Sequence, residues 1–188
     1  MRKYGLPLLL ALALLLSGCG GDRAARARYE EVSRRLRKAE VICAEAKLRC
    51  EYEDRSVEFR LRCKADDDAV ELEVLEPELI AGIRASVESG GTRMEYEGMI
   101  LDLGPLDPYG LSPLGALPLL LDTLRSGHLD SHWEEDGAPV WQLTRDDHTG
   151  VTVWMSPDFK PLRAEILSDD QVRVFLELTD WSEQAKEE

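Results

Sequence analysis

From residue 46 the sequence alternates between apolar and charged side chains with a period of two. Ala46, Leu48, Cys50 and Tyr52 are separated by charged residues, and after a polar turn at 54–56 the alternation continues to Cys63. A period of two places successive side chains on opposite faces of a strand, so these segments predict an antiparallel sheet with one apolar and one solvated face. The apolar face of such a sheet must be covered by another element.

The same alternation recurs along much of the chain. Further strands are expected at residues 70–74, 79–87 and 93–103, with Gly90-Gly91 as a hairpin turn, and again at 140–143, 151–155, 162–166 and 172–178. The two groups of strands are separated by a stretch rich in glycine and proline at 104–118, which cannot be regular throughout. The sequence therefore predicts two meanders joined by an irregular connection.

Two helices are expected beside these strands. Residues 24–43 place apolar side chains at steps of three and four, with arginines around the remaining surface. Ser112 and Pro113 suit an N-cap and a first helical position, so a second helix is expected from 113 to 125, ending at Gly127. This helix is apolar nearly all round and must be covered on more than one side. The order helix, meander, helix, meander predicts one α+β domain.

The first residues predict export. Arg2 and Lys3 precede an apolar run at 6–16, which is too short to span a bilayer, because about 20 apolar residues are needed. The run ends in Leu16-Ser17-Gly18-Cys19, which resembles the bacterial lipobox, and the resemblance implies a diacylglyceryl group on Cys19. An ordinary signal peptide with an incidental cysteine is the alternative. We expect a signal peptide at 1–18, a lipidated anchor and linker at 19–23, a domain at 24–181 and a polar, frayed tail at 182–188.

The charge distribution limits the partners. The whole chain carries a net charge of −14, and clustered cations are needed to neutralise nucleic-acid phosphates, so nucleic acid is not an expected partner. Seven cations nevertheless gather in the helical segment 23–38 beside the anchor. That segment either contacts anionic lipid headgroups, at about 1 kcal/mol per cation, or is a solvated helix face. The expected location is the extracytoplasmic side of a cell membrane or outer membrane.

The helix, the one-faced sheet and the anchor together resemble the LolA/LolB-like lipoprotein-carrier superfamily, which includes anchored regulatory relatives. The segments that carry the resemblance are VLEPELIAGI (74–83), MEYEG (94–98) and LRAEI (162–166). The resemblance implies a strongly curved antiparallel sheet, an incomplete β-barrel, whose concave face is covered by the N-terminal helix and the central apolar helix. Because related folds serve different functions, the fold alone does not define the function.

Two functions remain open. In the first, the half-barrel binds a lipid or acyl chain in a cavity whose lining is apolar; otherwise the same residues are core. The residues expected to line this cavity are Leu48, Tyr52, Phe59, Leu61, Leu72, Val74, Met94, Tyr96, Leu117 and Leu121. In the second, the protein holds or regulates an envelope partner such as a cell-wall enzyme, through Trp133, Trp141, Trp154 and Trp181; these are otherwise core residues.

Catalysis is not expected. His128, His132 and His148 have no orienting partner in the sequence, and no nucleophile elbow, metalloprotease or phosphate-binding motif is present. Residues 66–68 are three consecutive aspartates, which suit either a calcium site or a plain acidic turn. No cofactor and no metal site is expected. Besides Cys19 there are three cysteines, and a strand register in which Cys50 faces Phe59 favours a disulfide between Cys43 and Cys63, with Cys50 buried and free.

Overall fold

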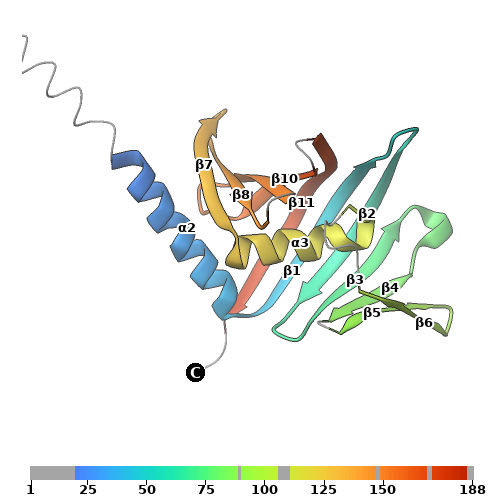
Figure 1. Ribbon diagram of the computed structural model, residues 1–188. Coiled ribbons are helices and arrows are strands. Elements are labelled where there is room, and N and C mark those ends of the chain that lie inside the picture. Colours follow the sequence, from blue (N-terminus) through green and yellow to red (C-terminus); the bar gives the residue numbers. More distant parts are fainter. Residues whose placement is uncertain (1–19, 89, 106–110, 147–148, 169–170, 186–188) are drawn as a thin grey trace, which may run out of the picture.

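The computed structural model describes residues 20–88, 90–105, 111–146, 149–168 and 171–185 (Figure 1). The signal segment, Cys19 and His148 lie outside these residues. Within them, no helix is long and apolar enough to cross a membrane.

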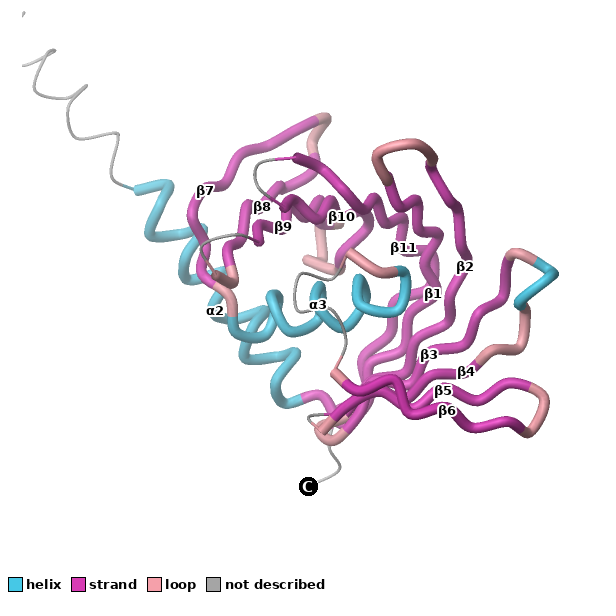
Figure 2. Tube along the Cα trace, turned by 45° about the vertical axis from the view of Figure 1, so that its right-hand side comes forward, coloured by secondary structure: helices cyan, strands magenta, loops and turns pink. Residues whose placement is uncertain are grey.

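The described strands form one antiparallel sheet in the order β6-β5-β4-β3-β2-β1-β11-β10-β9-β8-β7. Their bounds are β1 (Ala39–Glu51), β2 (Ser56–Ala65), β3 (Ala69–Glu76), β4 (Arg84–Glu88), β5 (Gly91–Tyr96), β6 (Met99–Gly104), β7 (His128–Glu135), β8 (Ala138–Thr144), β9 (Thr149–Met155), β10 (Pro161–Ser168) and β11 (Gln171–Ala185). The two meanders meet where β1 pairs with β11. The sheet curves around a central helix and leaves β6 and β7 as its two edges (Figure 2). The predicted α+β fold with a curved, incompletely closed sheet is confirmed.

The central helix, α3 (Pro113–Ser126), begins and ends where the sequence predicts. The Ser112 hydroxyl accepts a hydrogen bond from the Gly115 amide at 3.1 Å, as expected of an N-cap. The helix crosses the concave face of the sheet (Figure 1), and its buried residues include Leu117, Leu120 and Leu124, each with no exposed surface. The all-round apolar character of α3 is therefore explained by the sheet that wraps around it.

The N-terminal helix, α2 (Gly20–Lys38), is shorter than predicted at its end. The apolar period predicts that this helix continues to Cys43, but residues 39–43 form the first part of β1. The apolar residues Ala39 and Cys43 fit a helical period, whereas burial of Ile42 and Ala44 shows that the strand alternation already applies there. Pairing of this segment with the end of β11 satisfies its backbone groups, and the β-branched residues Val41 and Ile42 suit a strand.

The same pairing corrects the expected frayed tail. Residues 182–185 belong to β11, where Ser182 faces Cys43 and Ala185 faces Ala39. The polar composition of this segment suggests a tail. It is nevertheless held by its backbone hydrogen bonds to β1, which polar side chains do not prevent.

Three strand predictions are also wrong in detail. The segment 79–87 begins with a short 3-10 helix, η1 (Glu78–Ile80), and only its second half is the strand β4. The segment 93–103 is two strands, because Glu97 and Gly98 both have positive φ and form a two-residue hairpin turn. The segment around His128 and His132, where the sequence predicts no strand, is the strand β7, which pairs with β8 through a second such turn at Asp136 and Gly137.

The cysteine prediction rests on a register that is two residues out. Cys50 pairs with Val57, not Phe59, because the turn between β1 and β2 contains four residues, from Tyr52 to Arg55. Cys63 pairs with Ala44, and Cys43 pairs with Lys64, so Cys43 and Cys63 point to opposite faces of the sheet. The predicted Cys43–Cys63 disulfide is therefore not formed. All three cysteines are free, and Cys50 and Cys63 are buried.

Candidate functional site: the uncovered end of the concave face

Helix α3 fills the half-barrel over its central strands. Six of the ten residues expected to line a cavity are core residues with at most 4% of their surface exposed: Leu48, Leu61, Leu72, Val74, Leu117 and Leu121. These side chains belong to the main apolar cluster of the protein, which also contains residues of α2 and of β8 to β11. In this part of the sheet the apolar face is therefore occupied by the protein's own helix.

Toward β6, helix α3 no longer covers the concave face of the sheet. One cross-strand row on the concave face runs through Cys63, Leu72, Ala85, Met94 and Leu101, each paired with the next. The first three are buried at 1, 2 and 4% exposure, Met94 is half-buried, and Leu101 is 52% exposed. The sheet thus continues past the helix, and its apolar face becomes accessible over β5 and β6.

Two of the predicted cavity residues lie at this uncovered end. Met94 and Tyr96 are both half-buried on β5, opposite Leu101 and Met99 of β6. The remaining two are elsewhere: Tyr52 is exposed in the β1–β2 turn, where Arg55 lies 5.8 Å from its ring, and Phe59 is half-buried on β2. Met99 and Leu101 are not among the predicted cavity residues, because the alternation over 93–103 predicts a single strand. The Glu97-Gly98 turn would have identified them as part of a second strand.

A groove of about 510 Å³ lies between α3 and the strands β3 and β4. Its apolar lining comes from Val70 and Val87 on the sheet and from Pro118, Leu119 and Leu121 on the helix. Val87 pairs with Thr92, which is 3% exposed and lies two residues along β5 from Met94, so the groove is one strand away from the half-buried residues of β5. Together they form an open apolar surface of the kind that accommodates a ligand beside a few polar groups.

The rim of this groove is charged. Asp66, Asp67, Asp68 and Asp122 lie along it with Arg125 and Arg145, and Arg145 Nε is 3.0 Å from Asp122 Oδ2. Asp66 Oδ1 accepts hydrogen bonds from the backbone amides of Ala69 and Asp68, which lower the pKa of this carboxyl. Asp66 therefore stabilises the β2–β3 turn, as the acidic-turn alternative expected. In the described part of the chain, no cluster of ligands suits a metal ion.

The position of α3 is fixed by side chains of α2. The Tyr29 hydroxyl donates to the Gly127 carbonyl at 2.6 Å and lies 3.2 Å from the Thr123 carbonyl, and the Ser33 hydroxyl donates to the Arg125 carbonyl at 2.5 Å. In return, Arg125 Nε donates to the Leu36 carbonyl at 3.3 Å. Each helix thus satisfies carbonyls at the C-terminal end of the other. Burial raises the pKa of Tyr29, which keeps its hydroxyl protonated as a donor.

An aromatic cluster continues this contact into the sheet. Tyr29 lies edge-on against Trp141 at 5.7 Å between ring centroids, and Trp141 stacks on Phe159 at 5.6 Å. Trp141 is buried, so it is a core residue and not part of a contact surface. Trp133 is 40% exposed on β7, whereas Trp154 and Trp181 are half-buried.

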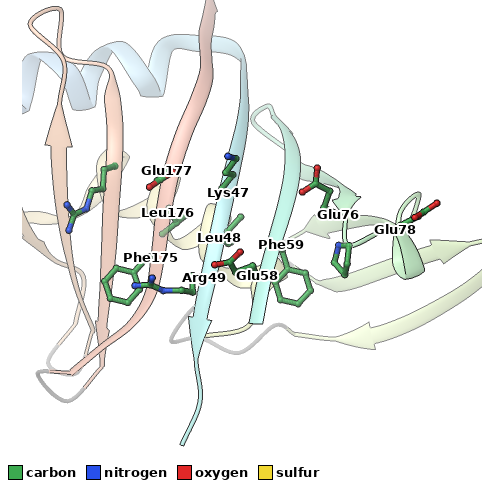
Figure 3. Close-up of a pocket in the computed structure, with 12 residues that line it drawn as sticks. Lys47, Leu48, Arg49, Glu58, Phe59, Glu76, Glu78, Phe175, Leu176 and Glu177 are labelled. Atoms are coloured by element: carbon green, nitrogen blue, oxygen red, sulfur yellow. The ribbon is translucent and has the colours of Figure 1, made fainter. Parts of the chain in front are cut away.

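A second and larger groove, of about 710 Å³, lies on the outer side of the sheet (Figure 3). Its lining is mostly charged, including Lys47, Arg49, Glu58 and Glu177, and Arg49 lies 4.3 Å from the centre of the Phe175 ring. These side chains are the solvated half of the strand alternation, and opposite charges face each other across neighbouring strands. The outer groove is therefore poorly suited to an apolar ligand.

Two of the three histidines lie in the part of the chain that the structure describes. His128 and His132 lie on β7, and His132 Nε2 is 3.2 Å from Asp22 Oδ1 at the start of α2. This contact joins the helix to the edge strand and is exposed. His148 lies outside the described residues.

The comparisons with known proteins concern the fold. No model of a protein family matches the sequence, and no curated protein sequence is similar to it. The structure is similar to that of an uncharacterized conserved protein from Thermus thermophilus, with a TM-score of 0.51 and 12% identity over 87% of this chain and 90% of that one. These two chains share a fold.

Two further solved structures have lower TM-scores. One is a LolA superfamily protein from Nitrosomonas europaea, with a TM-score of 0.46 and 11% identity over 87% of this chain and 94% of that one. Another is a chain in the structure of the CwlD amidase from Clostridioides difficile in complex with the GerS lipoprotein, with a TM-score of 0.44 and 11% identity over 87% and 94% of the two chains.

Proposed function

We propose that this protein is a membrane-anchored, extracytoplasmic lipoprotein that binds a lipid or acyl chain at the uncovered end of its half-barrel. The observation that carries the proposal is the change in exposure along the concave row, from 4% at Ala85 to 52% at Leu101, beside the apolar groove under α3. Binding an acyl chain there would remove apolar surface from water, at about 25 cal/mol per Å². The role is binding and not catalysis.

The anchor in this proposal is the lipid on Cys19. Cys19 directly precedes α2, whose arginines are largely exposed, so the basic helix would lie beside the anionic headgroups. Helix α2 begins on the opposite side of the molecule from β6 (Figure 1). The ligand surface would thus stand away from the point of attachment and remain open for exchange.

Titration with a fluorescent fatty acid tests the proposal. Met94→Glu places an unpaired carboxylate on the concave row, and we expect it to weaken binding by about tenfold or more, which corresponds to roughly 1.4 kcal/mol. Leu162→Glu is the matched control, because Leu162 is an exposed apolar residue of β10 and the change in charge is the same. Equal affinities of the two variants, or no uptake by the unmodified protein, would refute this function.

The interaction alternative has one structural feature in its favour, the exposed apolar strand β6. An envelope protein that used it would add an extended segment to the edge of the sheet. Recovery of such a protein crosslinked to β6, together with no uptake of fatty acid, would favour this alternative over ligand binding.

A further inference from the structure

Strand β6 is an edge strand with an unusually apolar surface. Met99, Ile100, Leu101 and Leu103 are 61, 62, 52 and 47% exposed. The strand carries one charged residue, Asp102, whose Oδ1 lies 3.7 Å from Arg93 Nε on β5. Among the described strands, β6 has a neighbour on one side only. Its free edge therefore offers both unpaired backbone groups and apolar side chains.

The other edge of the sheet is different. β7 carries the acidic residues Asp130, Glu134 and Glu135 within eight residues. Charged side chains on an edge strand discourage pairing with another chain, and in a protein with a net charge of −14 two acidic edges repel each other. β7 is protected in this way and β6 is not.

The hairpin turn determines which backbone groups of β6 are free. Tyr96 and Met99 flank the two-residue turn at Glu97 and Gly98, so they form a hydrogen-bonded pair. Hydrogen-bonded pairs alternate along an antiparallel ladder, so Met94 and Leu101 form the next one. The amides and carbonyls of Ile100 and Asp102 consequently point away from β5, toward the free edge.

We propose that β6 pairs in antiparallel orientation with β6 of a second copy of this chain, about a two-fold axis at Leu101. In this register Leu101 faces its own copy, and Ile100 faces Asp102 of the other molecule. The outward amides and carbonyls of Ile100 and Asp102 then hydrogen-bond to each other on both sides of the axis. The Leu101 pair lies between them as a non-hydrogen-bonded pair, with Cα atoms about 4.5 Å apart.

Side-chain chemistry agrees with this register. Paired residues of antiparallel strands point to the same face, so both Leu101 side chains extend the concave apolar surface, next to the two Met94 residues. The single acid of the strand faces Ile100 and remains beside Arg93, so no like charges meet across the axis.

The expected interface is small. One pair of six-residue strands buries less than the lower limit of about 1,200 Å² for standard interfaces, so the free molecules associate weakly. Anchoring both copies in one membrane raises their effective concentration and favours the pair. The dimer is therefore expected at the membrane, with the full chain in place.

Oxidative crosslinking in cell membranes that contain the full chain tests the proposal. Leu101→Cys places two thiols on the axis at a Cα separation within disulfide reach, and we expect an oxidant to shift this variant from monomer to dimer on a non-reducing gel. Leu162→Cys is the matched control, with similar exposure on β10, and is expected to remain monomeric. It also reports any crosslinking through the half-buried Cys43.

A second variant separates pairing from folding. Ile100→Pro removes an amide that points away from β5, so it leaves the β5–β6 ladder intact but cannot support pairing with a second copy. Added to Leu101→Cys, it is expected to abolish the dimer without changing resistance to protease. Persistence of the dimer in this double variant overturns the proposal.

The remaining outcomes also oppose it. An adduct of Leu101→Cys with a protein of another mass identifies a different partner for β6. If Leu101→Cys gives no adduct, its reaction with a membrane-impermeant maleimide separates two cases. A thiol that reacts shows that the edge of β6 is unpaired. A thiol that is protected shows that something other than a second β6 covers the edge.

Discussion

The two ends of the sheet are built from the same alternating pattern but differ in what lies on their apolar face. Toward β7, helices α2 and α3 cover the strands, and side chains such as Leu143 and Val153 have no exposed surface. Toward β6, the helices end and the apolar residues of the last two strands are open. The difference shows that the helices, and not the strand pattern, decide where the half-barrel is core and where it is accessible surface.

The largest expected effect contrasts the two ends directly. Leu120→Ala removes a fully buried side chain of α3 and should lower the free energy of unfolding by about 2–5 kcal/mol. Leu101→Ala, at the open end, should change the stability by no more than about 0.5 kcal/mol. Urea unfolding of both variants measures the contrast. If both variants lost a similar free energy of unfolding, the side chain of Leu101 would be covered in solution, which contradicts an accessible apolar face at β6.

A smaller effect is expected at the contact that holds α3 over the covered end. Tyr29→Phe removes the donor to the part-buried Gly127 carbonyl, while the Thr123 carbonyl still accepts from the Gly127 amide, so the loss should be about 1–3 kcal/mol. Tyr52→Phe, at an exposed turn residue, is the control and should leave the urea midpoint unchanged. If Tyr29→Phe also left the urea midpoint unchanged, this contact between α2 and α3 would not contribute to holding α3 over the sheet.

A third prediction concerns the way in which the buried thiols Cys50 and Cys63 make the stability depend on pH. Burial raises the pKa of Cys63 to about 12 and that of Cys50 to about 11, from 9.0 in an unperturbed thiol. Above pH 9 the unfolded chain therefore loses these protons before the folded one. The stability should be complete below pH 9 and fall toward pH 11–12, by at most about 1.4 kcal/mol per pH unit for each thiol.

Urea unfolding at several pH values between 8 and 11 measures this slope. Cys63→Ala should make the slope shallower, because one of the two thiols no longer contributes. A slope that is unaffected by Cys63→Ala would assign the loss of stability to other groups. Among these is Tyr29, whose pKa is also raised by burial.

The parts of the fold that the sequence predicts correctly depend on local pattern. The alternation after residue 46 and the capped apolar helix at 113–125 are recognisable because each needs only a few neighbouring residues to be identified. The Asp136-Gly137 turn is an equally local indication of a hairpin, and it would have identified β7. The candidate site is only half found from the sequence, since Met94 and Tyr96 are predicted while Met99 and Leu101 on the next strand are not.

The parts that fail depend on pairing between distant segments. Whether residues 39–43 continue a helix or begin a strand is decided by β11, which reaches them from more than a hundred residues away. The predicted Cys43–Cys63 disulfide fails for the same reason, because Cys43 lies on the strand β1 and points to the face opposite that of Cys63. The register between β1 and β2 is also two residues from the predicted one, because it is set by the length of one turn. A shift of two residues preserves the face of every side chain, so the apolar pattern could not reveal it.

The sequence by itself determined that the chain forms one-faced strands and that a capped apolar helix lies between the two groups of strands. These features follow from the periodicity and order of neighbouring residues. Only the tertiary structure decided how far the helix reaches across the sheet, and so which apolar residues are core and which are exposed. The reason is physical: the alternation requires a covered face, but the number of strands that a helix of 14 residues can cover is set by its path over the sheet.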